Sequence, residues 1–248
     1  MNSLTSMKEK REGGFTLLEL LIVISIIAIL SIALVFMLNP AETLKKGRDA
    51  QRISDLKTLK TSIGLMLTST STPSLDGTFG AAAPAVCLTK GDGTTAGALG
   101  AKIAYSSYPA PTSGVTATPG PDAVATGTFA AAGYAAASQA AAGKVDGTGW
   151  IPINFKALTG GSPLSNLPVD PVNVASAAAS ATDLVYRYAC QNGSSAAGKP
   201  SFIFEVDAVL ESNAYTVDDN KMAKDGGDYA TMYETGNSLN LLPTSGAF

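Results

Sequence analysis

Histidine is absent from the 248 residues of the chain, and this absence excludes more chemistry than any other feature of the composition. Without an imidazole there is no Ser–His or Cys–His nucleophile pair, and no metal site that depends on histidine ligands. The sequence also lacks a nucleophile motif and a glycine-rich phosphate-binding loop. Glu205 and Glu211 are candidates for an acid/base pair, but the sequence does not fix their geometry. The composition therefore argues against an enzyme.

Charged residues are also scarce, at 15% of the chain, and they are unevenly distributed. Residues 42–60 contain six basic and three acidic side chains, whereas residues 61–248 contain eight basic and fourteen acidic ones. Contacts to phosphate groups need lysine and arginine. The acidic C-terminal part therefore argues against nucleic-acid binding on the bulk surface of the protein.

The one long apolar run extends from Phe15 to Leu38, and Glu19 is its only charged residue. At about 1.5 Å of rise per residue, a helix of this length measures roughly 36 Å and can cross a hydrocarbon core of about 30 Å. A carboxylate inside such a segment costs about 2.5–3.5 kcal/mol, so Glu19 is expected to have a partner or a function. Basic residues lie on both sides of the run, so they do not define the orientation of the span.

A short charged leader, residues 1–14, precedes the run and ends in two glycines, with Met7 as a second candidate start. The sequence Gly14-Phe15-Thr16-Leu17-Leu18-Glu19 follows, and this order resembles the class III signal of type IV prepilins and pseudopilins. The resemblance implies that a prepilin peptidase cleaves between Gly14 and Phe15, and that the new amino group of Phe15 is N-methylated. A plain membrane anchor is the alternative interpretation.

The resemblance also implies a role for Glu19. In an assembling filament of this family, the glutamate pairs with the terminal amine of Phe15 on a neighbouring subunit, and burying both charges together costs less than burying either alone. The alternative is a carboxylate that reaches the cytoplasmic interface, since Glu19 lies only about 6 Å along the helix from Phe15.

Residues 39–68 are predicted to form an amphipathic stalk helix. Asn39 fits the N-cap, Pro40 the first helical position and Glu42 the third. Because this start directly follows another helix, we expect a kink at Asn39–Pro40. Apolar residues then recur every three or four positions and form one stripe, namely Ile53, Leu56, Leu59, Ile63 and Met66.

Three charged residues of the stalk, Arg48, Asp49 and Arg52, lie about one turn apart. Mixed charges of this kind usually mark a solvated helix face, and the alternative is charge pairing between subunits along a filament. The string from Arg48 to Lys57 also resembles the stalk of bacterial pseudopilins.

Residues 69–148 are dominated by Ala, Gly, Thr, Ser and Pro, which indicates a variable region made largely of loops. A short alanine-rich helix, weakened by Gly133, is predicted from Ala130 to Ala142. This region contains Cys87, and the second cysteine of the chain is Cys190. In an exported domain the two would form one disulfide, worth roughly 4–5 kcal/mol for a loop of about 100 residues. Two reduced thiols are the alternative.

Residues 149–248 are predicted to form a small antiparallel β-sheet domain. The segments 184–190 and 201–210 are rich in strand-forming residues and flank an Asn-Gly turn, which predicts a hairpin. The order Leu167-Pro168-x-Asp170-Pro171, followed by Tyr186-x-Tyr188, resembles the major pseudopilins of type II secretion. The sequence therefore predicts an α+β fold, in which a long kinked N-terminal helix packs on this sheet.

Acidic residues gather between positions 205 and 234. Without histidine, oxygen atoms are the available metal ligands, and calcium takes six to eight of them. Major pseudopilins hold calcium in a C-terminal loop of similar composition, and the resemblance implies four candidate ligands, namely Asp218, Asp219, Asp225 and Asp228. Their spacing is not that of an EF-hand, and a solvated acidic loop is the alternative.

These features favour a structural subunit, a pilin or pseudopilin that assembles through its N-terminal helix into a homo-oligomeric filament with minor pilins. Assembly would require a prepilin peptidase, a platform protein and an assembly ATPase. The subunit would cross the cytoplasmic (inner) membrane once and then join an extracellular or periplasmic filament. The alternative is a single-pass, membrane-anchored extracellular binding protein that does not polymerise.

Overall fold

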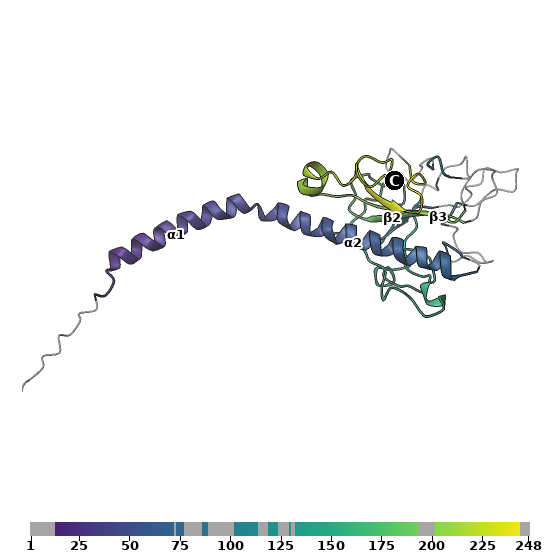
Figure 1. The fold of residues 1–248 in the computed structure, drawn as a ribbon, viewed down its shortest axis with the longest axis horizontal. Coiled ribbons are helices and arrows are strands. Elements are labelled where there is room, and N and C mark those ends of the chain that lie inside the picture. Colours follow the sequence, from purple (N-terminus) through teal and green to yellow (C-terminus); the bar gives the residue numbers. More distant parts are fainter. Residues whose placement is uncertain are drawn as a thin grey trace, which may run out of the picture. The chain divides into compact units, whose positions relative to one another are not determined.

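A computed structural model describes residues 13–71, 73–76, 86–88, 102–113, 119–123, 129, 132–192 and 201–243. The chain divides into two compact units, Met1–Thr43 and Leu44–Phe248. Two long helices come first, α1 (Leu17–Leu38) and α2 (Pro40–Ser69), as Figure 1 shows. The described part of the second unit adds the strands β1 (Ala104–Tyr105), β2 (Tyr186–Gln191), β3 (Ile203–Ala208) and β4 (Tyr233–Gly236) and the short turns η1 (Gln139–Ala141), η2 (Phe155–Ala157) and η3 (Ala214–Asp218).

The predicted break between the two helices is confirmed. α1 ends at Leu38, Asn39 takes a left-handed conformation with φ 38°, and α2 begins at Pro40. Proline has no N–H group and its ring collides with the carbonyl of the preceding turn, so one uninterrupted helix cannot pass this point. Asn39 then caps α2, because its Oδ1 accepts a hydrogen bond from the backbone N–H of Glu42 at 3.4 Å.

The four strands form one antiparallel sheet in the order β1-β2-β3-β4. The predicted hairpin is its centre, with the register running from Tyr186 opposite Ala208 to Gln191 opposite Ile203. Together with the long N-terminal helix, this sheet confirms the predicted α+β fold. Neighbouring residues of a strand point to opposite faces, so the sheet has two distinct sides.

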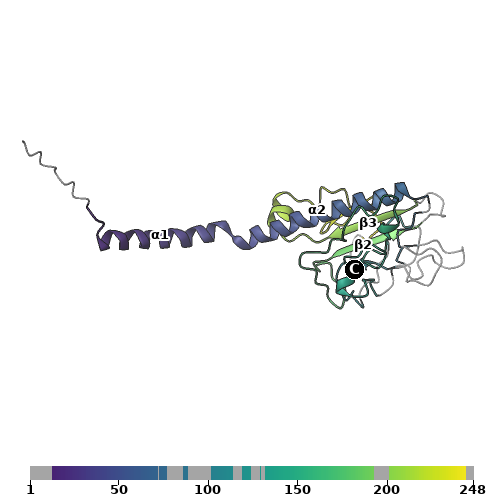
Figure 2. The same cartoon turned by 90° about the horizontal axis from the view of Figure 1, so that it is seen from below.

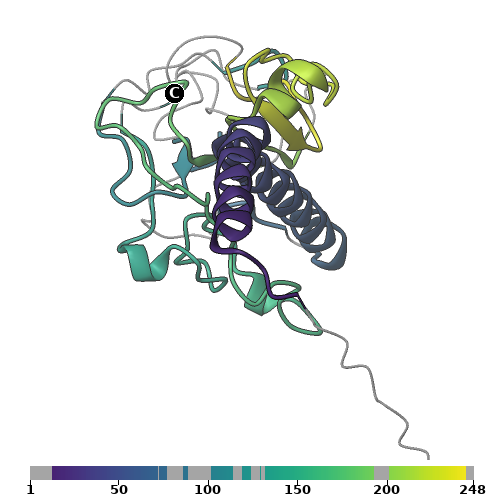
Figure 3. The same cartoon turned by 90° about the vertical axis from the view of Figure 1, so that its left-hand side faces the viewer.

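α2 covers the first side of the sheet. Its residues Leu56, Leu59, Ile63 and Met66 are buried in one core with Trp150 and with the tyrosines of β2, while Ile53 is half-buried. Figure 2 shows α2 lying along β2 and β3. In Figures 1 and 3, the yellow-green C-terminal segments lie on one side of α2 and the teal loops on the other. The predicted stripe therefore packs against the sheet.

The second side of the sheet is covered by loops and by the C-terminal segment. A separate core gathers there around Ile103, Phe129, Met232 and Leu241. Two of these residues belong to the low-complexity region 69–148, which also supplies β1. Parts of this region are therefore integral to the sheet domain.

The predicted alanine-rich helix is wrong over its described part, residues 132–142. Only a single 3-10 turn, Gln139–Ala141, forms there, capped by the side chain of Ser138. Gly133 lies against the ring of Tyr105, where an added Cβ would collide with the ring. Contacts with the sheet therefore fix an extended path that alanine propensity alone does not predict.

The predicted disulfide is present between Cys87 and Cys190. It ties residues 86–88 to β2, and the backbone N–H of Leu88 donates to the carbonyl of Cys190 at 2.8 Å. The two cysteines are 103 positions apart, which corresponds to roughly 4–5 kcal/mol in the chain-entropy treatment.

Candidate processing and assembly site

The predicted cleavage junction is accessible. Gly13 and Gly14 lie outside any helix, and an added Cβ at either glycine would meet no atom within 4 Å. Phe15 is 92% exposed, and the first helical residue is Leu17. A peptidase can therefore approach the Gly14–Phe15 bond without unwinding a helix. The remainder of the leader, residues 1–12, lies outside the described residues.

Glu19 lies in the first turn of α1 and closes a capping box with Thr16. Its carboxylate Oε2 accepts the backbone N–H of Thr16 at 2.8 Å, and Thr16 Oγ1 accepts the N–H of Glu19 at 3.2 Å. The pattern Thr-x-x-Glu before an apolar run is the sequence signal of this arrangement, in addition to the pairing role considered for Glu19. In this chain the carboxylate is thus held one residue away from the nitrogen of Phe15.

The rest of α1 is apolar on every side, and no residue of the helix is buried. The hydroxyl groups of Ser25 and Ser31 donate to helix carbonyls, those of Ile22 and Ile27, at 2.7 Å each. Among the described residues, this is the helix long and apolar enough to cross a membrane. A helix without a polar face suits lipid or a bundle of like helices.

The stalk charges are buried in the second unit, so the interpretation as a solvated face is wrong for Asp49 and Arg52, which are fully buried. Arg52 forms a bidentate pair with Asp170 at 2.6 and 3.0 Å. Its Nη1 also donates to Asp49 at 2.7 Å and to Glu211 at 2.8 Å. We call Arg48, Asp49, Arg52, Asp170 and Glu211 the Arg52 network.

The Arg52 network joins two sequence motifs that lie far apart in the chain. Arg52 belongs to the stalk string, whereas Asp170 belongs to the Leu-Pro-x-Asp-Pro segment, 118 positions later. Glu211 adds a bidentate pair with Arg48 at 2.6 and 2.8 Å. Asp49 in turn accepts the backbone N–H of Ser212 at 2.8 Å. These bonds fix α2 to two loops of the sheet domain.

The network also sets the ionisation of its members. Although burial opposes the charged form, the bonds to Asp170 and Glu211 raise the pKa of Arg52 above its usual value. The hydrogen bonds from Arg48, followed by those from Arg52, lower the pKa of Glu211 to about 2. Both residues therefore stay charged at neutral pH.

A second buried charged group lies on the other side of the sheet. Glu205, Asp207 and Glu234 are each at most 2% exposed, and Arg187 is the cation beside them. We call these four residues the Glu205 cluster. The Nη1 group of Arg187 donates to Asp207 Oδ1 over a long distance of 3.4 Å.

The carboxyl groups of the Glu205 cluster have raised pKa values. Burial raises the pKa of Asp207 to about 7, against the opposing effect of Arg187. Burial also raises the pKa of Glu205 and of Glu234, and the neighbouring carboxyl group of Glu205 adds to the rise for Glu234. The backbone N–H groups of Leu241 and Leu242 both donate to Glu205 Oε2 at 2.8 Å.

The structure separates the two glutamates that were candidates for an acid/base pair. Glu205 lies in the buried cluster on one side of the sheet, and Glu211 lies in the Arg52 network beside α2. Glu205 is fully buried, and Glu211 is bound by two guanidinium groups. The structure does not bring them together.

The four candidate calcium ligands are not assembled either. The side chain of Asp219 is paired with Lys221 and Lys224 at 2.5 Å each, and these bonds lower its pKa to about 2. Asp225 accepts the backbone N–H groups of Gly227 and Glu234 at 2.9 and 2.8 Å. Among the described residues, which include all four aspartates, no three acidic side chains are placed to hold a metal ion. Calcium binding therefore stays a prediction.

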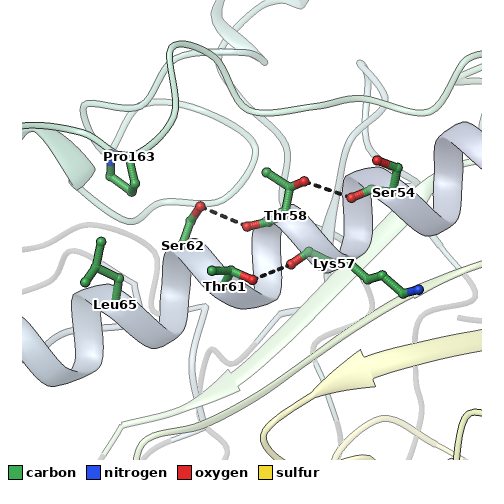
Figure 4. A pocket seen from close by; sticks show the side chains of 7 residues that line it. All are labelled: Ser54, Lys57, Thr58, Thr61, Ser62, Leu65 and Pro163. Atoms are coloured by element: carbon green, nitrogen blue, oxygen red, sulfur yellow. Dashed lines mark hydrogen bonds between the residues drawn. The ribbon is translucent and has the colours of Figure 1, made fainter.

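The exposed side of α2 carries an open groove of about 400 Å³. Figure 4 shows its lining of small polar side chains on α2, with Pro163 from a loop beside them. The hydroxyl groups of Thr58, Thr61 and Ser62 donate to carbonyls of their own helix at 2.8–3.0 Å. The groove therefore presents hydroxyl groups that are already bonded, and Lys57 is the one charged residue of its lining.

Comparison with known proteins identifies one feature of the chain. A family model described as the prokaryotic N-terminal methylation motif matches residues 10–35. This match covers the end of the leader, the Gly14–Phe15 junction, Glu19 and most of α1. No curated protein and no solved structure matches the chain.

Proposed function

From the premise that the chain carries the methylation motif of type IV pilin-like and pseudopilin precursors, we propose that it is a structural, non-catalytic subunit of a filament. A prepilin peptidase cleaves it between Gly14 and Phe15, and the amino group of Phe15 is methylated. The mature subunits then polymerise through α1, together with minor pilins. A platform protein and an assembly ATPase supply the machinery, and the acidic domain remains outside the membrane.

The observation that carries this proposal is the combination of an accessible junction with a helix that is apolar on every side. A simple anchor needs the apolar helix but has no use for the Gly14–Phe15 junction or for a charge at Glu19. A filament subunit uses the apolar helix, the Gly14–Phe15 junction and the charge of Glu19. The Arg52 network supports the proposal further, because it holds α2 to the sheet domain and so makes the second unit a fixed body.

Cleavage is tested by intact-mass analysis of the protein purified from membranes. The proposal expects a chain that begins at N-methylated Phe15, and electron microscopy of sheared surface material from the same cells should show filaments. A full-length chain beginning at the leader, in cells that contain an active prepilin peptidase, would contradict the proposal. That result would favour the second candidate, a membrane-anchored binding protein that does not polymerise.

The assembly role of Glu19 is tested by Glu19→Ala. We expect normal membrane insertion and processing but a loss of filament yield of about tenfold or more, because the amine of Phe15 would lose its buried partner. The yield is measured by quantitative immunoblotting of sheared filaments against the membrane fraction.

The matched control is Thr16→Ala. This variant removes the hydroxyl half of the capping box, at a cost to the helix of about 1 kcal/mol, and keeps the carboxylate. It should assemble at close to the normal level. Equal yields from Glu19→Ala and from the unaltered chain would refute the pairing role, and equal losses from both variants would assign the effect to capping.

A further inference from the structure

The beginning of α2 and the turn η3 meet in a small surface of mixed character. The ammonium group of Lys46 lies 5.9 Å from the ring centre of Tyr215, and that of Lys221 lies 6.0 Å from the same ring centre. Val217, two positions after the tyrosine, is 70% exposed. We call Lys46, Tyr215, Val217 and Lys221 the lysine–tyrosine surface.

This surface is held rigidly within the second unit. The backbone N–H groups of Tyr215 and Thr216 donate to the carbonyl of Ser212 at 3.1 and 3.0 Å, and the N–H of Lys221 donates to the carbonyl of Tyr215 at 2.9 Å. Ser212 is itself bonded to Asp49 of the Arg52 network. The exposed valine is therefore presented from a fixed position.

The composition of the surface is that of a membrane interface. Tyrosine with its polar tip, an exposed apolar side chain and flanking lysines is the set of residues enriched at the headgroup level of bilayers. Lys224 adds positive charge to this surface, because it shares Asp219 with Lys221, and Asp218 is exposed beside them. The three lysines Lys46, Lys221 and Lys224 outnumber these two aspartates, which favours an anionic partner.

The length of the chain keeps this surface close to the bilayer. Only eight positions separate Leu38, the last residue of α1, from Lys46. Even a fully extended segment of that length spans no more than about 28 Å. A surface this close along the chain to the end of α1 meets the membrane at a high effective concentration, so weak contacts are sufficient for docking.

We propose that the lysine–tyrosine surface docks on the anionic phospholipid headgroups of the membrane that α1 crosses. Val217 enters the interface while Lys46 and Lys221 approach the phosphates. The inference rests on the membrane anchoring in the proposed function and is independent of polymerisation. Docking holds the unassembled subunit against the bilayer.

The test uses the full chain reconstituted in vesicles, with an environment-sensitive fluorophore on Val217→Cys. Both native cysteines are joined in the disulfide, so the label is specific. The matched control is the same label on Val174→Cys, an equally apolar position that is 63% exposed and lies outside the surface. Vesicles of phosphatidylcholine are compared with vesicles of equal parts phosphatidylcholine and phosphatidylglycerol.

We expect a blue-shifted emission at position 217, and quenching by brominated lipids, in the vesicles that contain phosphatidylglycerol. The label at position 174 should show neither effect. The double variant Lys46→Gln, Lys221→Gln should lower the ratio of docked to undocked protein by about tenfold or more, while Lys224 remains to pair with Asp219.

Two outcomes would overturn the proposal. The first is an emission at position 217 that is the same in both kinds of vesicle. The second is a shift that grows with the ratio of protein to lipid, which would assign the surface to contact with a second copy of the chain. Because neither readout depends on filaments, failure here is distinguishable from failure of the proposed function.

Discussion

The Arg52 network and the Glu205 cluster contain similar acidic residues, but the pKa values of Glu211 and Asp207 shift in opposite directions. The Arg52 network sets three carboxylates against two arginines at 2.6–3.0 Å. The Glu205 cluster sets three carboxyl groups against Arg187, which reaches Asp207 at 3.4 Å. The pKa of Glu211 in the first group falls to about 2, whereas burial raises that of Asp207 in the second to about 7.

The comparison shows that burial alone does not decide whether a carboxyl group is charged. Desolvation raises the pKa of both Glu211 and Asp207. It is overcome at Glu211, where two guanidinium groups donate at 2.6–2.8 Å, and not at Asp207, where one donates at 3.4 Å. The two sides of one sheet should therefore respond to pH in opposite directions. The Arg52 network stabilises the folded protein above the acid range and loses this effect as the pH falls toward 2. The Glu205 cluster is most stable below neutrality, because its buried carboxyl groups are then uncharged.

The largest expected effect comes from removing the central cation. Arg52→Met leaves Asp49 and Asp170 buried without their main partner, and we expect a loss of about 3–5 kcal/mol in the free energy of unfolding. Denaturant unfolding of the detergent-solubilised protein, followed by the fluorescence of the buried Trp150, measures this loss.

Lys57→Met is the matched control, because Lys57 is exposed on the same helix. A change within about 0.5 kcal/mol is expected for this surface substitution. If the two variants unfolded at the same denaturant concentration, the Arg52 network would not be what fixes α2 to the sheet domain.

A smaller loss is expected from Glu211→Gln, about 1–3 kcal/mol at pH 7. The lowered pKa of Glu211 means that its contribution is present above about pH 4.5 and is lost as the pH falls toward 2. Glu211 is partly open to solvent, so screening keeps the loss of stability below the value that its whole pKa shift would give. Unfolding curves between pH 2 and 7 should show a weaker acid dependence for the variant than for the unaltered chain. An unchanged acid dependence would contradict this assignment.

The smallest effect, with the opposite sign, is expected from Glu234→Gln. Because the folded state holds a proton that the unfolded state releases above about pH 4.5, the glutamate costs stability as the pH rises. The neutral amide avoids this cost, and its oxygen can still accept the N–H of Tyr229. We expect the variant to gain about 1–2 kcal/mol at pH 7, and more at pH 9. A loss of stability at pH 9 would show that Glu234 is ionised in the folded protein.

Much of the fold was predictable from local patterns. The break at Asn39–Pro40 follows from proline chemistry, the stripe from Leu56 to Met66 follows from helical periodicity, and the hairpin follows from two runs of strand-forming residues. The disulfide followed from there being only two cysteines. The capping box of Thr16 and Glu19 was equally local and was present in the sequence as Thr-x-x-Glu.

The interpretations that failed concern residues whose surroundings come from distant parts of the chain. Arg52 belongs to a helix with mixed charges, and nothing within its own turn indicates that Asp170 will bury it. The segment 132–142 has the composition of a helix, but contacts such as that between Gly133 and Tyr105 give it another path. Local propensity is worth less than about 1 kcal/mol per residue, so packing overrides it.

The sequence by itself therefore determined the methylation motif, the long apolar helix, the kink and the central hairpin, because each depends on residues close together in the chain. Only the tertiary structure decided which charges are buried, in which direction the pKa of each buried carboxyl group shifts, and that η3 meets the beginning of α2. The physical reason is that desolvation and ion pairing depend on which groups are neighbours in space. For Arg52 and Asp170, those neighbours are 118 positions apart.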